Sequence, residues 1–181
     1  MVAREITNPE GQTRTLLIRD FSIEERDVEF MSAPTLVPSN GDQCGDSTFE
    51  LTGDENAKSP NIDDCNDLAS GLRGMDQHWE LNNWYAIATD PDWLDLVSVG
   101  TCHFYINRKN FIDSTTDGKN LIGTADIADL VQDTVSRFQK WGTVTYPGGS
   151  LQVGTVIPAT GNMGCFPGNW DTPWRIQENQ P

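Results

Sequence analysis

The chain has 181 residues, 36% of them hydrophobic, and a formal net charge of −15. This length and composition fit one folded domain and exclude a disordered chain. The negative charge repels nucleic-acid phosphates and anionic headgroups, so we expect no nucleic-acid partner. No apolar run reaches the roughly 18 to 20 residues of a membrane-spanning helix, and we expect no membrane insertion.

The first forty residues are charged and irregular, and they end in the linker-like segment SAPTLVPSNGD. The chain start, MVAREITNPEG, has neither a basic n-region nor an apolar h-region, so it does not separate a mature secreted protein from a cytosolic one. We therefore predict an N-terminal extension or pro-segment with linker over residues 1–41, a domain over 42–177, and a tail over 178–181.

A half-buried strand and a helix are predicted at the start of this domain. The segment STFELTG alternates apolar and polar residues, as a strand with one buried face does. A helix follows, with Ser59 as the N-cap, Pro60 at the first helical position and Gly74 as the stop signal. Cys65 lies on the apolar stripe of this helix, so its side chain should face the core.

The segment GTADIADLVQDTVSRFQKWG predicts a second helix. Thr124 is its expected cap, and apolar residues recur every three or four positions as far as Trp141. Gly142 can adopt the left-handed conformation that ends a helix.

Strand-like runs rich in β-branched and aromatic residues surround the helices, and short turns separate them. Connections this short favour antiparallel pairing. The predicted fold is therefore α+β, a compact antiparallel β-sheet with two α-helices packed on it. The runs lie at residues 85–89, 96–106, 120–124, 143–147, 150–157 and 172–177.

Four cysteines stand far apart, without the close-spaced pairs typical of zinc sites. Two disulfides are favoured over buried free thiols and over a metal site, so we expect neither metal nor cofactor. Disulfides indicate an oxidising compartment and hence secretion. The cysteines are Cys44, Cys65, Cys102 and Cys165.

No catalytic set emerges from residue spacing, and we expect no enzymatic activity. The run from Asp113 to Thr124 resembles a calcium loop but lacks the glutamate at its twelfth position. The acids between Asn61 and Asp64 are interpreted as an exposed first helical turn. His78 is either a candidate base or a hydrogen-bonded loop histidine. A polysaccharide hydrolase whose carboxyl groups meet only in three dimensions stays open.

Six tryptophans provide the candidate binding residues. Trp141 is assigned to the core by its place on the second helix. Trp79 and Trp84 are the candidates for stacking on a sugar or anchoring a partner, with core filling as the alternative.

Several segments taken together resemble the fungal necrosis-inducing effector family, homologues of extracellular protein two of the tomato leaf-mould fungus. The similar segments are CGDSTFELTG, SPNIDDC, GTCHFYI, IGTADIADLVQDTVSRF and GNMGC. The resemblance covers about residues 42–176 and includes the order of all four cysteines. It implies no catalytic residues, and it implies a fold similar to the compact α/β sandwich of killer toxins.

The resemblance also implies a secreted effector that acts in the plant apoplast. Its partner would be a plant host protein or surface receptor, and the outcome would be cell death or defence. The alternative is a killer-toxin-like protein that acts against competing microbes. The oligomeric state is open.

For the disulfides we prefer Cys44 with Cys165 and Cys65 with Cys102. This choice places a helix cysteine opposite a strand cysteine. Loop-closure entropy alone does not decide between this pairing and Cys44 with Cys65 and Cys102 with Cys165.

Overall fold

The computed structural model describes residues 1–19, 35–38, 41–52, 57–81, 93–107, 120–166 and 170–178. Within these ranges it has two helices, and every paired strand is antiparallel to its neighbour. The predicted α+β class is confirmed. The expected run at 85–89 lies outside the described residues.

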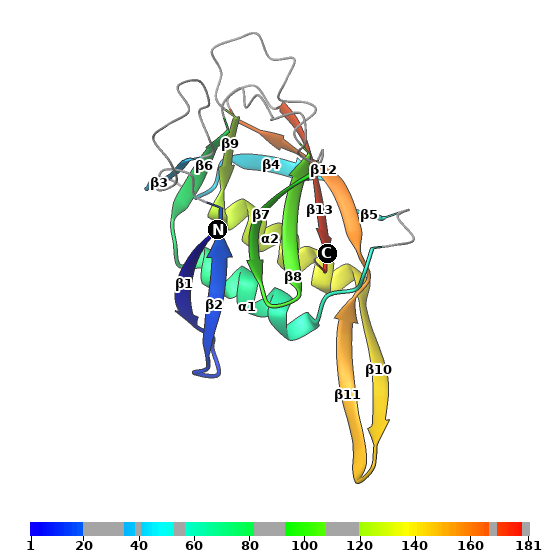
Figure 1. Ribbon diagram of the computed structural model, residues 1–181. Coiled ribbons are helices and arrows are strands. Elements are labelled where there is room, and N and C mark those ends of the chain that lie inside the picture. Colours follow the sequence, from blue (N-terminus) through cyan, green and yellow to red (C-terminus); the bar gives the residue numbers. More distant parts are fainter. Residues whose placement is uncertain are drawn as a thin grey trace.

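An eight-stranded sheet forms the centre of the protein (Figure 1). Its strand order is β1-β2-β7-β8-β13-β12-β4, and β5 pairs with β12 on the side that also carries β4. The strands are β1 (Val2–Thr7), β2 (Thr13–Ile18), β4 (Cys44–Ser47), β5 (Glu50–Leu51), β7 (Trp93–Val99), β8 (Cys102–Asn107), β12 (Ala159–Cys165) and β13 (Trp170–Gln177).

Two smaller sheets complete the strand content of the described residues. One is three-stranded, in the order β3-β6-β9, and the other is the β10–β11 hairpin. Figure 1 shows this hairpin projecting from the rest of the protein. The strands are β3 (Thr35–Pro38), β6 (Gln77–Leu81), β9 (Asn120–Gly123), β10 (Gln139–Tyr146) and β11 (Gly149–Val156).

The helices α1 (Ile62–Arg73) and α2 (Thr124–Phe138) pack against each other, and α1 also contacts β2, β7 and β8. Their apolar side chains and those of the large sheet form one continuous core. Fully buried members of this core include Leu68, Leu72, Phe104, Ile127 and Trp174. In the described part of the chain, neither helix has the length and apolar character needed to cross a membrane.

The helix boundaries differ from the sequence-based ones. In α1 the N-cap is Asn61 rather than Ser59, and its side chain accepts a hydrogen bond from the Asp63 amide at 2.7 Å. The second helix ends at Phe138, so the prediction that Trp141 belongs to it is wrong. Cross-strand pairing of Trp141 with Gly154 in β10–β11 takes precedence over the helical pattern.

Residues 1–18, which we expected outside the domain, contribute to the large sheet. β1 and β2 form a hairpin, and β2 pairs with β7 from Leu16 to Ile18. The side chains of Leu16 and Ile18 are buried in the core. The side chains of β2 therefore follow the pattern of a strand with one buried face.

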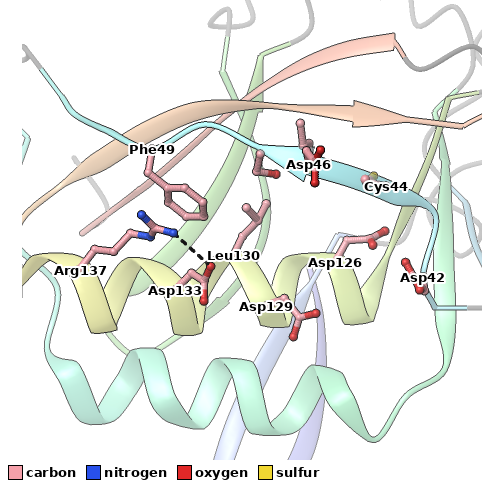
Figure 2. Close-up of a pocket in the computed structure, with 12 residues that line it drawn as sticks. Asp42, Cys44, Asp46, Phe49, Asp126, Asp129, Leu130, Asp133 and Arg137 are labelled. Atoms are coloured by element: carbon pink, nitrogen blue, oxygen red, sulfur yellow. Dashed lines mark ion pairs between the residues drawn. The ribbon is translucent and has the colours of Figure 1, made fainter.

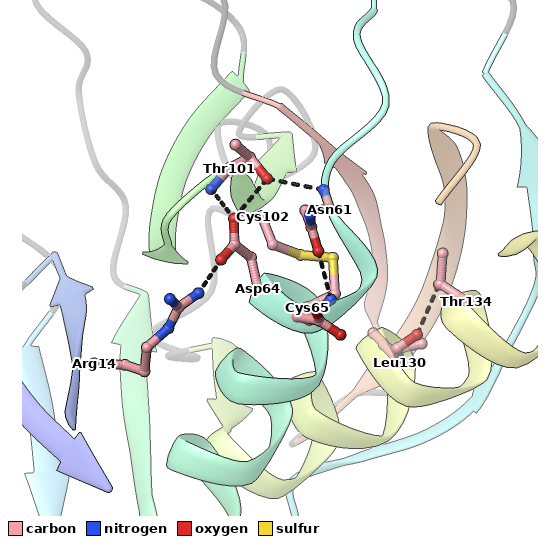
Figure 3. The surroundings of a disulfide bond; sticks show 9 residues. Arg14, Asn61, Asp64, Cys65, Thr101, Cys102, Leu130 and Thr134 are labelled. Carbon is pink, nitrogen blue, oxygen red and sulfur yellow. Dashed lines mark hydrogen bonds and ion pairs between the residues drawn. A yellow bond between two sulfur atoms is a disulfide. The ribbon is translucent and has the colours of Figure 1, made fainter. Parts of the chain in front are cut away.

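All four cysteines form disulfides, Cys44 with Cys165 and Cys65 with Cys102. This is the pairing that placed a helix cysteine opposite a strand cysteine. The Cys65–Cys102 bond joins α1 to β8, a strand inside the large sheet, and both residues are fully buried (Figure 3).

Asp64, beside this disulfide, connects three segments of the chain. Its carboxylate pairs with Arg14 of β2 and accepts hydrogen bonds of 2.8 Å from the amide and the hydroxyl of Thr101, in the β7–β8 turn (Figure 3). The interpretation of these acids as an exposed first turn is wrong for Asp64, whose side chain is only 14% exposed. The neighbouring Asp63 is exposed, as expected.

Replacement of Cys65 and Cys102 together by alanine should lower the free energy of unfolding by about 4 kcal/mol, because a loop of this length loses its cross-link in the unfolded state. Chemical denaturation of wild type and variant measures the difference. A change within about 0.5 kcal/mol would contradict a structural role for this bond.

Asp64→Asn should destabilise the protein by about 1 to 3 kcal/mol, because Arg14 and Thr101 lose their charged partner in a part-buried site. The matched control is Asp63→Asn in the same helical turn, which should stay within about 0.5 kcal/mol of wild type. Equal effects of the two substitutions in thermal and chemical unfolding would refute this role of Asp64.

Candidate functional site

A groove of about 290 Å³ runs between α2 and the segment that contains β4 (Figure 2). The helix contributes one wall, and residues 42–49 contribute the other. Five of the twelve lining residues are aspartates, and Phe49 and Arg137 also line the groove. The aspartates are Asp42, Asp46, Asp126, Asp129 and Asp133.

The carboxylates of the groove come from two separate segments. Asp126, Asp129 and Asp133 recur at three and four residues along α2, so they share one side of the helix. Asp42 and Asp46 lie on the opposite wall. Their combined charge favours a cationic group in the groove.

Arg137 closes the groove toward the C-terminal end of α2. Its guanidinium lies 4.4 Å from the centre of the Phe49 ring, and it is 3.8 Å from the Asp133 carboxylate. Asp129 is 67% exposed on its side chain and pairs with Arg73 of α1 at 2.7 Å. The contacts of Arg137 fix the end of the groove that lies near the C-terminus of α2. Asp129 stays open to solvent in the helical wall.

Asp126 is the buried acid of the groove and also the third residue of α2. Its Oδ2 atom accepts hydrogen bonds of 2.8 Å from the amides of Gln43 and Gly123. Burial raises the pKa of Asp126 to about 6; hydrogen bonds from main-chain amides oppose this effect, and a hydrogen bond with the Asp42 side chain adds to it. Asp126 therefore fixes the position of the 41–44 segment against the helix.

The opposite wall is held in place by covalent and steric constraints. The Cys44–Cys165 disulfide joins β4 to β12. The Gly41 carbonyl accepts a hydrogen bond from the Ala125 amide at 2.8 Å, and a Cβ atom at Gly123 would overlap that carbonyl. Because the wall is held in this way, the groove exists before any ligand binds.

The predicted binding tryptophans are not part of this groove. Trp79 lies in β6 with no exposed surface, and its indole N–H donates to the Arg19 carbonyl at 3.0 Å. Trp79 is therefore a core residue in this structure, because its ring faces have no access to a ligand. Trp84 lies outside the described residues. Trp141, which was assigned to the core, is 59% exposed.

The histidines lie away from the groove. His78 is buried in β6, so it is not a loop residue, and His103 in β8 has its Nδ1 atom 2.8 Å from Asp95 Oδ2. Ser98 is opposite His103 on β7, but its hydroxyl is buried and makes no hydrogen bond to any described residue. Ser98 is thus not a solvent-accessible nucleophile for the pair of Asp95 and His103.

Among the described residues, no group of three or more His, Cys, Asp or Glu side chains is arranged to hold a metal ion. Most of the run that resembled a calcium loop, residues 113–119, lies outside those residues.

The groove was not predicted from the sequence. The prediction of the second helix rested on its cap and its apolar stripe, and it connected Asp126, Asp129 and Asp133 with no binding site. Asp42 and Asp46 lie about eighty residues earlier, and only the fold brings them opposite the helix. The available signal was the i, i+3, i+7 pattern of acids on one helix.

Residues 43–165 match the model of the Hce2 family, described as "Pathogen effector; putative necrosis-inducing factor". The match contains all four cysteines, α1 and α2, and most of the groove. The chain belongs to this family of pathogen effectors. The β1–β2 hairpin and β13 lie outside the matched range. No curated protein matches the chain significantly.

Asp126→Asn should change the pH dependence of stability. Between a folded pKa of about 6 and the ordinary value of 3.8, the folded protein binds a proton that the unfolded chain does not bind. This site therefore adds stability as the pH falls from 7 to 4. The amide side chain resembles the protonated acid but does not titrate.

The unfolding free energies of wild type and Asp126→Asn, measured from pH 7 to pH 3, test this expectation. Wild type should gain relative to the variant between pH 7 and pH 4, and the difference should level off below the unfolded pKa. A difference that is constant across the range, or that changes in the opposite direction, would contradict the raised pKa.

Proposed function

We propose that the protein is a secreted effector that acts in the plant apoplast. It binds a host component, a protein or surface receptor, and thereby triggers cell death or defence. The observation that carries the proposal is the pair of disulfides within a family of pathogen effectors. Disulfides of this kind persist in oxidising compartments, which supports action outside the cell.

The acidic groove is the candidate contact site for this function. It is open, preformed and rich in carboxylates, so a segment of the host component with lysine or arginine side chains would complement it. Activity through contact needs no reacting group, and the family is not known for enzymatic activity.

Infiltration of the purified, disulfide-intact protein into leaves of a broad panel of host genotypes tests the function. We expect ion leakage and cell death in responsive genotypes, and loss of the response after reduction and alkylation. The absence of any response across the panel would contradict the proposal. Growth inhibition of microbial cultures without a leaf response would favour the killer-toxin-like alternative.

The role of the groove needs variants that change charge without changing the fold. The double variant Asp46→Asn and Asp129→Asn removes two exposed carboxylates from the groove. The matched control, Glu50→Gln and Asp63→Asn, removes two exposed carboxylates elsewhere. The groove variant should need at least about a tenfold higher dose than wild type to cause the same cell death. The control variant should need the wild-type dose. Equal responses would exclude the groove as the contact site.

A further inference from the structure

The β10–β11 hairpin is the most exposed part of the described chain. Every residue of β10 is exposed, and the hairpin projects away from the helices and the large sheet (Figure 1). Its exposed large side chains are Trp141, Val144, Tyr146 and Leu151, each more than half exposed. Between Asp133 and Asp171 the chain contains no acidic residue, although it has 27 in total. The β10–β11 hairpin, which we also call the arm, therefore carries no carboxylate side chain although the protein is acidic.

The register of the hairpin separates its side chains onto two different faces. One face carries Trp141 opposite Gly154, Thr143 opposite Gln152, and Thr145 opposite Ser150. We call it the Trp141 face. The other face carries the apolar pair Val144 and Leu151, together with Tyr146 and Lys140. The Trp141 face therefore combines one large aromatic ring with hydroxyl and amide groups and has no charged side chain.

The six-membered ring of the Trp141 indole lies beside Gly154 of the neighbouring strand. A Cβ atom at Gly154 would be 3.0 and 3.1 Å from the Cζ3 and Cη2 atoms of this ring, so the ring rests where a side chain would otherwise stand. Trp141 is 59% exposed, so more than half of the residue is in solvent. Glycine at position 154 thus makes room for the part-exposed Trp141 ring, which we call the platform.

The base of the hairpin is fixed to the helices, which holds this platform in place. The Val156 amide donates to the Pro60 carbonyl at 2.9 Å, and the Ile157 amide donates to the Phe138 carbonyl at 3.0 Å. Ile62 of α1 would lie 2.6 Å from the same Cβ atom at Gly154, so α1 adjoins the Trp141 face at the base of the hairpin. Further out, the Gln152 amide donates to the Thr143 hydroxyl at 2.9 Å. A ligand would meet a surface that is already ordered.

We propose that the Trp141 face binds a neutral polysaccharide. The apolar face of a sugar ring can stack on the indole, and sugar hydroxyls can exchange hydrogen bonds with the hydroxyl and amide groups of Thr143, Thr145, Ser150 and Gln152. Successive residue pairs on this face are about 7 Å apart along the strand. The face is a strip and not a pocket, so it suits an extended chain.

The charge of the protein favours a neutral ligand on this face over an anionic ligand, a cationic ligand or a second copy of the chain. The net charge of −15 repels an anionic polymer or an anionic bilayer, and it also opposes the approach of a second copy. A cationic ligand finds no carboxylate on this face. Binding here does not depend on the proposed effector activity, and it would place the protein on a carbohydrate surface.

Retention on insoluble cellulose and chitin, and mobility in gels containing the soluble neutral β-glucan laminarin, test the proposal with the full chain. Wild type should bind at least one of these neutral polysaccharides. Trp141→Ala should weaken that binding about tenfold or more, and Trp141→Phe should restore part of it. The matched control is Tyr146→Ala on the opposite face of the same hairpin, which should bind as wild type does. Thermal unfolding confirms that each variant is folded.

Several results would overturn the proposal. One is the absence of wild-type binding to all three neutral polysaccharides, and another is equal loss of binding in Trp141→Ala and Tyr146→Ala. Binding only to polygalacturonate, only to phosphatidylserine vesicles, or a Trp141-dependent dimer in sedimentation would each assign the face to a different occupant. None of these assays needs a leaf response, so they fail or succeed separately from the effector function.

Discussion

The covalent bond between Cys65 and Cys102 is the constraint on which the arrangement of the other parts depends. It fixes the first turn of α1 to β8, which lies between β7 and β13 in the large sheet. Asp64 adds the neighbouring connections, because its carboxylate binds Arg14 of β2 and Thr101 of the β7–β8 turn. Helix, sheet and N-terminal hairpin therefore meet at two consecutive residues.

The second helix carries the two surfaces that we connect with function. Asp126, in the first turn of α2, fixes the groove wall, and Phe138, at the other end, leads directly into β10. Since α2 packs against α1, the position of both surfaces follows from the same helix pair. The Cys44–Cys165 bond then holds the outer wall of the groove to β12. A fixed groove and a fixed arm suit recognition by contact, in which binding energy is not spent on ordering the protein.

Much of the fold was accessible from the sequence because local patterns and tertiary packing agree there. The apolar stripe predicted α2 as far as Phe138, and the buried position of Cys65 on α1 favoured the observed disulfide pairing. The sequence patterns failed where a contact with a residue distant in the sequence determines the local structure. Trp141 continues the helical stripe, yet pairing with Gly154 places it in a strand. Asp42 reaches Asp126 only through the fold, so the groove had no local signal.

The distribution of charge gives the two surfaces opposite requirements. The groove concentrates carboxylates, so it discriminates in favour of cationic groups, whereas β10–β11 has no acid. Eight residues of a β-strand extend about 26 Å, which exceeds the screening length of about 8 Å at physiological ionic strength. The field of the acidic body therefore reaches Trp141, the third residue of β10, and weakens toward the tip of the hairpin. It disfavours anionic ligands at Trp141, and local contacts then select among neutral ones.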